Sequence, residues 1–302
     1  MRISMRILVT GSEGFIGSNL TKLDSDVMFE TLDKKGDPDH LIDLTRVNWD
    51  DFKLAKFQAV IHLAAEISVE ESFQRREHYW ETNVVATKNL FEACALASVP
   101  RIIFASSAAV YGPSGDPVKY VQHKPQPQSP YAETKVRGEE IGNLVSNEQT
   151  KVTSFRFFNV LGPGQSPDSN YAAVIPIFVD RLCKGDDIEI HGDGAQTRDF
   201  VNVKDVSRAL INAAEFSPKS NNEIINLGTG SGITVLELAH LISNIVEEEG
   251  GPSTSRILFG PQRKGDVRLS ISNNSGLEKY LDTANMTDLA VGIRELVRIN
   301  LH

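Results

Sequence analysis

Tyr131 and Lys135 stand four residues apart, a spacing that could support acid–base chemistry. Ser129 followed by Pro130 is typical of a helix start, so the two side chains are expected on one face of a helix over 131–145. A phenol with a pKa near ~10 is a weak base at neutral pH, and a neighbouring ammonium stabilises its phenolate. The same spacing also fits a Tyr/Lys pair on the protein surface, so the neighbouring motifs have to decide between a catalytic and a surface role.

Two hydroxyl side chains, Ser106 and Ser107, follow an aliphatic run that predicts a strand over 101–106. In open α/β sheets, ligands bind beyond the carboxyl ends of the strands. Ser107 could therefore donate a hydrogen bond to a ligand oxygen and relay a proton to Tyr131. The alternative is a simple turn at the end of the strand.

A glycine-rich segment, TGSEGFIG at 10–17, lies between a predicted strand over 6–10 and a predicted helix over 15–23. Glycine lets the backbone turn tightly and approach a pyrophosphate, while a helix N-terminus offers free N–H groups. The strand-turn-helix context predicts a dinucleotide-binding loop. Its binding residues are expected to be Gly11, Gly14, Phe15, Ile16 and Gly17.

Asp33 closes the next predicted strand, where a carboxylate would hydrogen-bond the adenosine ribose and favour NAD over NADP. Lys34 and Lys35 leave an alternative open, because a lysine at this place could face a 2′-phosphate. Further along, Asp43 and Leu44 could contact the adenine or form an ordinary surface turn.

Strands and helices alternate in the first half of the chain, which predicts βαβ units and a parallel sheet. Thr234 and Glu237 fit a capping box at the start of a later helix. The predicted fold is a Rossmann-type, doubly wound α/β sheet with a smaller α/β C-terminal substrate lobe. We assign the dinucleotide-binding domain to 1–160, with 199–227 returning to it, and the second lobe to 161–198 and 228–302.

Composition limits the classes of partner. The 302 residues include 31 basic and 40 acidic ones, and a net charge of -9 argues against nucleic-acid binding. Cys94 and Cys183 show no metal-ligand spacing, so we expect reduced thiols and no metal site. No signal peptide and no apolar run of ~20 residues is visible, which predicts a cytoplasmic protein with no membrane partner.

Taken together, the motifs resemble those of the extended short-chain dehydrogenase/reductases, the NAD-dependent epimerase/dehydratase family, over nearly the whole chain. The matching segments are TGSEGFIG at 10–17, HLAA at 62–65, Asn83 within TNVVATKNLFEAC, SSAAVYG at 106–112, SPYAETK at 129–135, RFFNVLGPGQ at 156–165, GDGAQTRDFVNVKDV at 192–206 and INLGTG at 225–230. In this family the GTGSG segment at 228–232 is a structural turn, so no cofactor is assigned to it.

The resemblance implies NAD as cofactor and gives each motif a role. Tyr131 is the catalytic acid and base, Lys135 its activator and Ser107 its hydrogen-bonding partner. Besides the glycine loop and the Tyr131–Lys135 pair, the implied cofactor-binding residues are Asp33, Asp43, Leu44, Leu63, Ala64, Ala65 and Asn83.

The resemblance also implies a nucleotide-sugar substrate. Arg198 and Arg263 would bind the diphosphate, since a planar guanidinium suits phosphate oxygens. Asp266 would lie near the nucleotide ribose, and His191 would stack on the base or remain an exposed loop histidine. The other implied substrate-binding residues are Ser107, Tyr131, Asn159, Val174 and Ser270. Ala173 departs from an asparagine that is common in 4-epimerases of the family.

Ala108 and Ala109 narrow the expected reaction. Dehydratases of the family carry Asp-Glu here and decarboxylases a glutamate, and alanine can move no proton. What remains is 4-epimerisation of a UDP-hexose, UDP-glucose/UDP-galactose, with Ser270 leaving room for N-acetyl forms. The alternatives are a UDP-uronic acid 4-epimerase, a 4-keto sugar reductase or dehydratase, and a non-catalytic NAD-binding regulatory protein. Family resemblance further implies a homodimer through a four-helix interface of residues 80–97 and 130–146.

Overall fold

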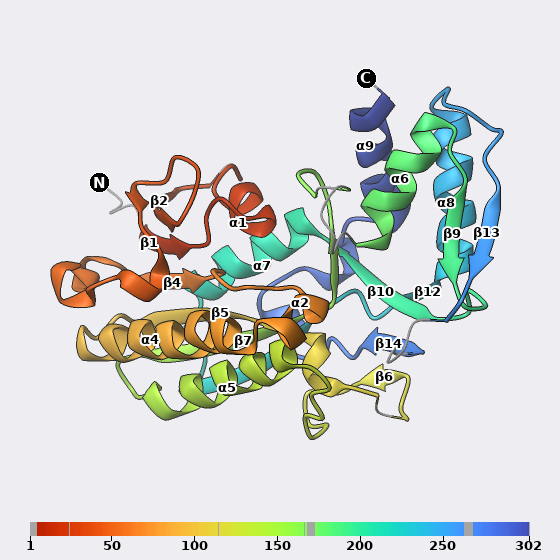
Figure 1. The fold of residues 1–302 in the computed structure, drawn as a ribbon. Helices are drawn as coiled ribbons and strands as arrows, with labels where there is room; N and C mark the ends of the chain where they lie inside the picture. The colour runs from red at the N-terminus through yellow and green to blue at the C-terminus, as the bar shows by residue number, and fades with distance from the viewer. Residues whose placement is uncertain are drawn as a thin grey trace.

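The computed structural model describes residues 5–23, 25–113, 115–165, 167, 173–262 and 268–301, which form two lobes (Figure 1). Within this part of the chain, one lobe is built on a seven-stranded sheet whose neighbouring strands are all parallel. Its order is β11 (Asn222–Leu227), β7 (Lys151–Phe157), β5 (Arg101–Ser107), β4 (Ala59–His62), β1 (Met5–Thr10), β2 (Val27–Asp33) and β3 (His40–Leu41).

The strand order reverses between β1 and β4. From β1 the chain runs outward through β2 and β3, and then crosses to β4 and continues through β5, β7 and β11 on the other side. Such a reversal opens a crevice at the carboxyl ends of the strands, where ligands bind in doubly wound folds. The predicted Rossmann-type sheet is therefore confirmed.

Helices cover both faces of this sheet, as the alternation of buried residues in β1 requires. Ile7 and Val9 pack in one apolar cluster, whereas Leu8 between them packs in another. On one face lie α1 (Phe15–Leu20) and α7 (Val203–Glu215); on the other lie α4 (Ala86–Leu96) and α5 (Pro130–Val145) (Figure 1).

The helical segment over residues 76–96 is divided. It consists of α3 (Arg76–Trp80), a π-helical turn over Glu81–Val85 and α4, with α2 (Val69–Gln74) before them. A π-helical turn shifts the helix face and is frequent at functional sites. Here the turn contains Asn83, which is buried and bonded to two other segments.

The second lobe has a sheet of its own, and part of it comes from the first half of the chain. The path is β12 (Gly232–Thr234), β10 (Thr197–Asn202), β14 (Leu269–Ser272) and β6 (Val118–Lys119), with β8 (Asn159–Leu161) also beside β10. Its helices α6 (Val174–Lys184), α8 (Val235–Glu248) and α9 (Leu289–Leu301) share an apolar core. A separate pair joins β9 (Ile188–His191) to β13 (Ile257–Gly260).

Two local features bear on the domain assignment and the capping prediction. Of the segment 199–227, α7 and β11 pack on the first lobe's sheet, whereas residues 199–202 belong to β10, in which Asp199 pairs with β12 and residues 200–202 pair with β8. The capping box at Thr234 and Glu237 is present, with Glu237 N donating to Thr234 Oγ1 at 3.1 Å.

Two properties of the described part of the chain bear on the expected partners. None of its helices is long and apolar enough to cross a membrane. Across the same residues, no group of three or more histidine, cysteine, aspartate or glutamate side chains is arranged to hold a metal ion.

Candidate active site

Helix α5 presents the Tyr131–Lys135 pair, and its start explains how. Ser129 Oγ accepts a hydrogen bond from Ala132 N at 3.1 Å, and Pro130 occupies the first turn, so the helix begins as the sequence predicts. Lys135 Nζ then lies 5.8 Å from the centroid of the Tyr131 ring. The ammonium also donates to Ala105 O at 2.7 Å, which anchors it to β5.

Burial governs the electrostatics of this pair. Desolvation lowers the pKa of Lys135 to about 8, against the opposing effect of the Glu139 carboxylate. Desolvation raises the pKa of Tyr131, and a hydrogen bond with Ser107 acts in the opposite direction. The phenol is therefore protonated at neutral pH, and further positive charge beside it would be needed to favour the phenolate.

Ser107 ends β5 and begins a 3₁₀ turn over Ala108–Tyr111. Its Oγ accepts a hydrogen bond from Ala109 N at 3.2 Å. Ala108 and Ala109 thus lie directly beside the Ser107–Tyr131 contact, and neither side chain can carry a proton. The three predicted catalytic residues converge at the carboxyl end of β5, where a ligand is expected.

The glycine loop is shaped to receive a dinucleotide. Gly11 has φ +76°, and a Cβ there would come within 2.6 Å of Ala64 N, so only glycine fits against the 63–65 segment. A Cβ at Gly17 would clash with Gly11 O. Gly14 precedes α1, whose first residues are Phe15 and Ile16, and it has no side chain to cap the helix.

The residues around the loop fit NAD. Ser12 Oγ is buried and has no hydrogen-bond partner within the described chain. Asp33 Oδ2 accepts from Glu13 N at 2.9 Å, and Asp33 Oδ1 accepts from Lys35 N at 3.3 Å. These bonds hold the carboxylate at the end of β2, beside the loop, as ribose recognition requires.

The remaining predicted cofactor residues differ in how far their side chains are already engaged in contacts within the protein. Asp43 Oδ1 accepts from Thr45 N and Oγ1 and so caps a 3₁₀ turn, whose Leu44 is buried in the core. Leu63 N donates to Thr10 O at 3.0 Å, and Ala64 and Ala65 continue that segment past the glycine loop.

Asn83 serves the structure around the cofactor crevice. Its Oδ1 accepts from Glu66 N, and its Nδ2 donates to Glu66 O, both at 2.8 Å. The same Nδ2 donates to Thr134 Oγ1 at 3.1 Å, in the helix that carries Tyr131. Asn83 thereby ties the segment after β4 to the catalytic helix.

The second lobe contains a cavity of about 460 Å³ that unites four of the predicted substrate residues. Asn159 Nδ2 donates to Asp199 O at 3.0 Å across the β8–β10 pair. Ser270 lies opposite Arg198 in the β10–β14 pair. The predicted residues lining the cavity are Asn159, Val174, His191 and Arg198. Arg263 and Asp266 lie outside the described residues.

His191 lies at the end of β9, on the wall of this cavity. Its Nδ1 lies 3.8 Å from Glu189 Oε1, and its carbonyl accepts from Gln196 Nε2 at 3.0 Å. His191 is thus a half-buried residue of the cavity wall rather than an exposed loop residue, and its stacking on a base stays a prediction.

Sequence reasoning missed Asp199, which follows Arg198 in β10 and is fully buried. Its carboxylate accepts from Thr229 N, Gly230 N and Ser272 N at 2.8 to 3.0 Å. Backbone donors of the GTGSG turn are thus engaged by this carboxylate, as expected of a structural turn. In the sequence, an acidic residue within the otherwise largely apolar strand segment RDFV could have indicated a buried carboxylate.

A buried ion pair behind the catalytic residues was also missed. Arg156 donates to both oxygens of Glu139 at 2.8 and 2.7 Å, and Ser106 Oγ donates to Glu139 Oε1 at 2.6 Å. The guanidinium lies 4.8 Å from the centroid of the Tyr111 ring, whose hydroxyl donates to Asn226 Oδ1. In the sequence, Glu139 follows Lys135 by four residues, and this spacing could have indicated that the two side chains share a helix face.

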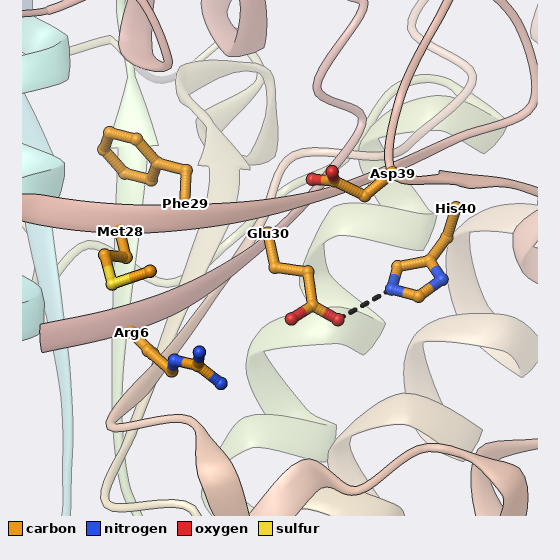
Figure 2. Close-up of a pocket in the computed structure, with 6 residues that line it drawn as sticks. All are labelled: Arg6, Met28, Phe29, Glu30, Asp39 and His40. Atoms are coloured by element: carbon orange, nitrogen blue, oxygen red, sulfur yellow. Dashed lines mark hydrogen bonds and ion pairs between the residues drawn. The ribbon is translucent and has the colours of Figure 1, made fainter.

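A smaller hollow of about 270 Å³ lies elsewhere, at the amino-terminal halves of β1 and β2. His40 Nε2 donates to Glu30 Oε1 at 2.7 Å, and Figure 2 shows Arg6 on the side of Glu30 away from His40. Because cofactors bind beyond the opposite ends of these strands, this hollow is separate from the catalytic crevice.

Comparison with known proteins agrees with this geometry. Residues 7–228 match the model of the NAD dependent epimerase/dehydratase family. The UDP-glucose 4-epimerase of Mycolicibacterium smegmatis is 35% identical, with 97% of each chain covered.

Solved structures are similar over nearly their full length. The UDP-N-acetylglucosamine 4-epimerase from Methanobrevibacter ruminantium M1, in complex with UDP-N-acetylmuramic acid, has a TM-score of 0.87 at 30% identity; 98% of this chain and 97% of that one are covered. MoeE5 in complex with NAD and UDP-glucose has a TM-score of 0.82 at 33% identity, with 97% of each chain covered. Its complex with NAD and UDP-glucuronic acid has a TM-score of 0.82 at 34% identity, covering 97% of this chain and 99% of that one.

Proposed function

The chain belongs to the NAD-dependent epimerase/dehydratase family, and within it we propose that it is a UDP-hexose 4-epimerase. The observation that carries the proposal is the setting of Tyr131. Ser107 and Lys135 flank its phenol, while Ala108 and Ala109 occupy the turn where an acid for dehydration or decarboxylation would be needed. A site that can only remove and return hydrogen at one carbon suits epimerisation.

NAD, held by the glycine loop and Asp33, supplies reversible hydride acceptance at C4 of the sugar when it is bound. Tyr131 Oη takes the proton of the C4 hydroxyl as the sugar is oxidised, and gives a proton back on reduction. The Lys135 ammonium stabilises the phenolate that has to be present before the first step and that the second step restores. Ser107 shares a hydrogen bond with the phenol and orients it toward the same oxygen.

The second lobe has to hold the UDP group while the oxidised sugar rotates in the site. The cavity beside Arg198 offers a guanidinium for the diphosphate and the His191 ring for the base. Asp199 and Asn159 brace the strand that carries Arg198. Anchoring at the nucleotide leaves the hexose free to present either face of C4.

A uronic acid 4-epimerase is the second candidate, because MoeE5 was solved with UDP-glucuronic acid as well as UDP-glucose. Such a substrate brings a carboxylate to C6 and would call for a cation there. The distinction is open to direct measurement with the corresponding substrates.

A homodimer is part of the proposal. Trp80, Leu96 and Leu144 are large apolar side chains that α3, α4 and α5 leave exposed, with Leu96 88% and Leu144 81% accessible. These helices belong to the segments 80–97 and 130–146 from which the four-helix interface is expected. Covering such side chains with a second copy of the chain would remove apolar surface from water.

The experiment is to incubate the protein with UDP-galactose, UDP-N-acetylglucosamine, UDP-glucuronate and dTDP-glucose, and to follow the products by NMR. We expect the C4 epimer of at least one UDP-hexose and no dehydrated sugar. Tyr131→Phe should slow turnover by about 10²–10⁴-fold while UDP-sugar binding is retained. A dehydrated or decarboxylated product, or a Tyr131→Phe enzyme as fast as wild type, would overturn the proposal.

A further inference from the structure

A lysine follows the ribose-binding carboxylate, yet the fold engages it elsewhere. Lys34 comes directly after Asp33, at a place where a lysine could face the 2′-phosphate of NADP. In the structure, Lys34 Nζ lies 2.6 Å from Glu66 Oε1, in a segment that follows β4. Glu66 was not among the residues predicted from the sequence.

The carboxylate is the fixed member of this ion pair. Asn83 hydrogen-bonds both the N–H and the carbonyl of Glu66, and the Glu66 side chain is 19% exposed, against 52% for Lys34. His78 Nε2 also lies 3.1 Å from the same Oε1. Burial acts to raise the pKa of Glu66, but the bonds from Lys34 and His78 outweigh it and lower the pKa.

The ion pair joins the segments that follow β2 and β4. In the sheet, β1 lies between β2 and β4, and the glycine loop begins at the end of β1. Lys34 comes from the end of β2 and Glu66 from beyond β4, so their contact spans the strand that starts this loop. The ammonium is thereby held by Glu66, although Lys34 is the neighbour of Asp33 in the chain.

We propose that Glu66 is a cofactor-specificity residue, which excludes NADP by holding Lys34. A 2′-phosphate carries up to two negative charges and needs a cation to pair with it. With Glu66 in place, the phosphate would have to take Lys34 from an ionised partner. The inference rests on the proposed placement of the ribose at Asp33.

Calorimetric titration with NAD and NADP tests this at one pH and low ionic strength. Glu66→Gln keeps the shape of the side chain but removes its charge, so we expect NADP to bind about fivefold more tightly, with NAD changed less than about twofold. Lys34→Met alone should leave NADP affinity nearly unchanged, because that lysine is already engaged. In the double variant the gain from Glu66→Gln should be lost.

Glu70→Gln is the matched control, because it removes an exposed carboxylate from the first turn of α2. An unchanged ratio of NADP to NAD affinity in Glu66→Gln would overturn the inference. So would an equal gain in Glu70→Gln, or a gain that survives Lys34→Met, since either would reflect general charge alone.

Asp33→Asn separates this inference from the cofactor placement. If Asp33→Asn alters neither cofactor's affinity, the placement of the ribose is wrong. If Asp33→Asn weakens NAD binding and Glu66→Gln changes nothing, the placement holds and the role of Glu66 fails. Thermal unfolding of each variant verifies that it is folded before titration.

Discussion

His62 offers a direct test of how the buried layer next to the site is built. Its Nδ1 lies 2.7 Å from Thr10 Oγ1, and its Nε2 lies 2.9 Å from Thr87 Oγ1, so both ring nitrogens have hydroxyl partners. The ring stacks on Phe104 with centroids 5.8 Å apart. Burial, assisted by the charge of Lys135, lowers the pKa of His62 to about 3.

Because its folded-state pKa lies below the ordinary value of 6.5, protonation of His62 favours the unfolded chain. Its contribution to stability is complete above pH 6.5 and is lost as the pH falls from 6.5 toward 3. The loss is about 1.4 kcal/mol per pH unit in this window, so about 2 kcal/mol is lost at pH 5.

The assay is urea unfolding at pH 7.5 and pH 5.0, with NAD at the same saturating excess in each case. His62→Gln keeps a donor and an acceptor but cannot be protonated. We expect the free energy of unfolding to fall by about 2 kcal/mol more in wild type than in His62→Gln between the two pH values. Equal pH dependence in the two proteins would refute the reasoning.

Three other changes have definite expected outcomes. Glu139→Gln leaves the buried Arg156 without its ion-pair partner, and the free energy of unfolding measured in urea should fall by about 3–5 kcal/mol; a loss below about 1 kcal/mol would contradict this. Ser270→Tyr should reduce kcat/KM for UDP-N-acetylglucosamine by roughly 10- to 100-fold through overpacking, with UDP-galactose unaffected, and equal losses would place Ser270 away from C2. Leu144→Glu should convert a dimer to a monomer of 33.3 kDa in analytical ultracentrifugation, whereas Val291→Glu on α9 should not; a wild-type monomer would contradict the proposed interface.

Much of the first lobe could be predicted because its signals are local. The strands β1 and β5 are short aliphatic runs whose observed bounds differ from the predicted ones by one residue. The start of α5 is specified by Ser129 and Pro130, within the same few residues. The π-helical turn within 81–85 was not predictable in this way, because its side chains continue a helical pattern.

The second lobe was harder because its strands depend on partners far away in the chain. β6 has two residues and pairs with β14, about 150 residues later, so it has no periodicity of its own. Residues 200–202 of β10 pair with β8, about 40 residues earlier in the chain, and residues 197 and 198 pair with β14, about 70 residues later. Local propensity cannot report such long-range pairing.

The same distinction applies to the site. Tyr131, Lys135 and Ser107 belong to recognisable motifs, and the structure brings them together. Glu66 and Asp199 lie near such motifs, yet their roles come from donors that other segments supply. The position of a carboxylate in the sequence does not indicate which backbone N–H or ammonium will donate to it in the folded protein.

The central claim is that hydrogen leaves C4 of the sugar and returns to the same carbon from within one site. UDP-galactose carrying deuterium at C4, incubated with the protein, tests this most directly by NMR and mass spectrometry. The account predicts UDP-glucose with the deuterium still at C4 and no exchange with solvent. Loss of the label to water, or a product that has lost water at C6, would contradict it.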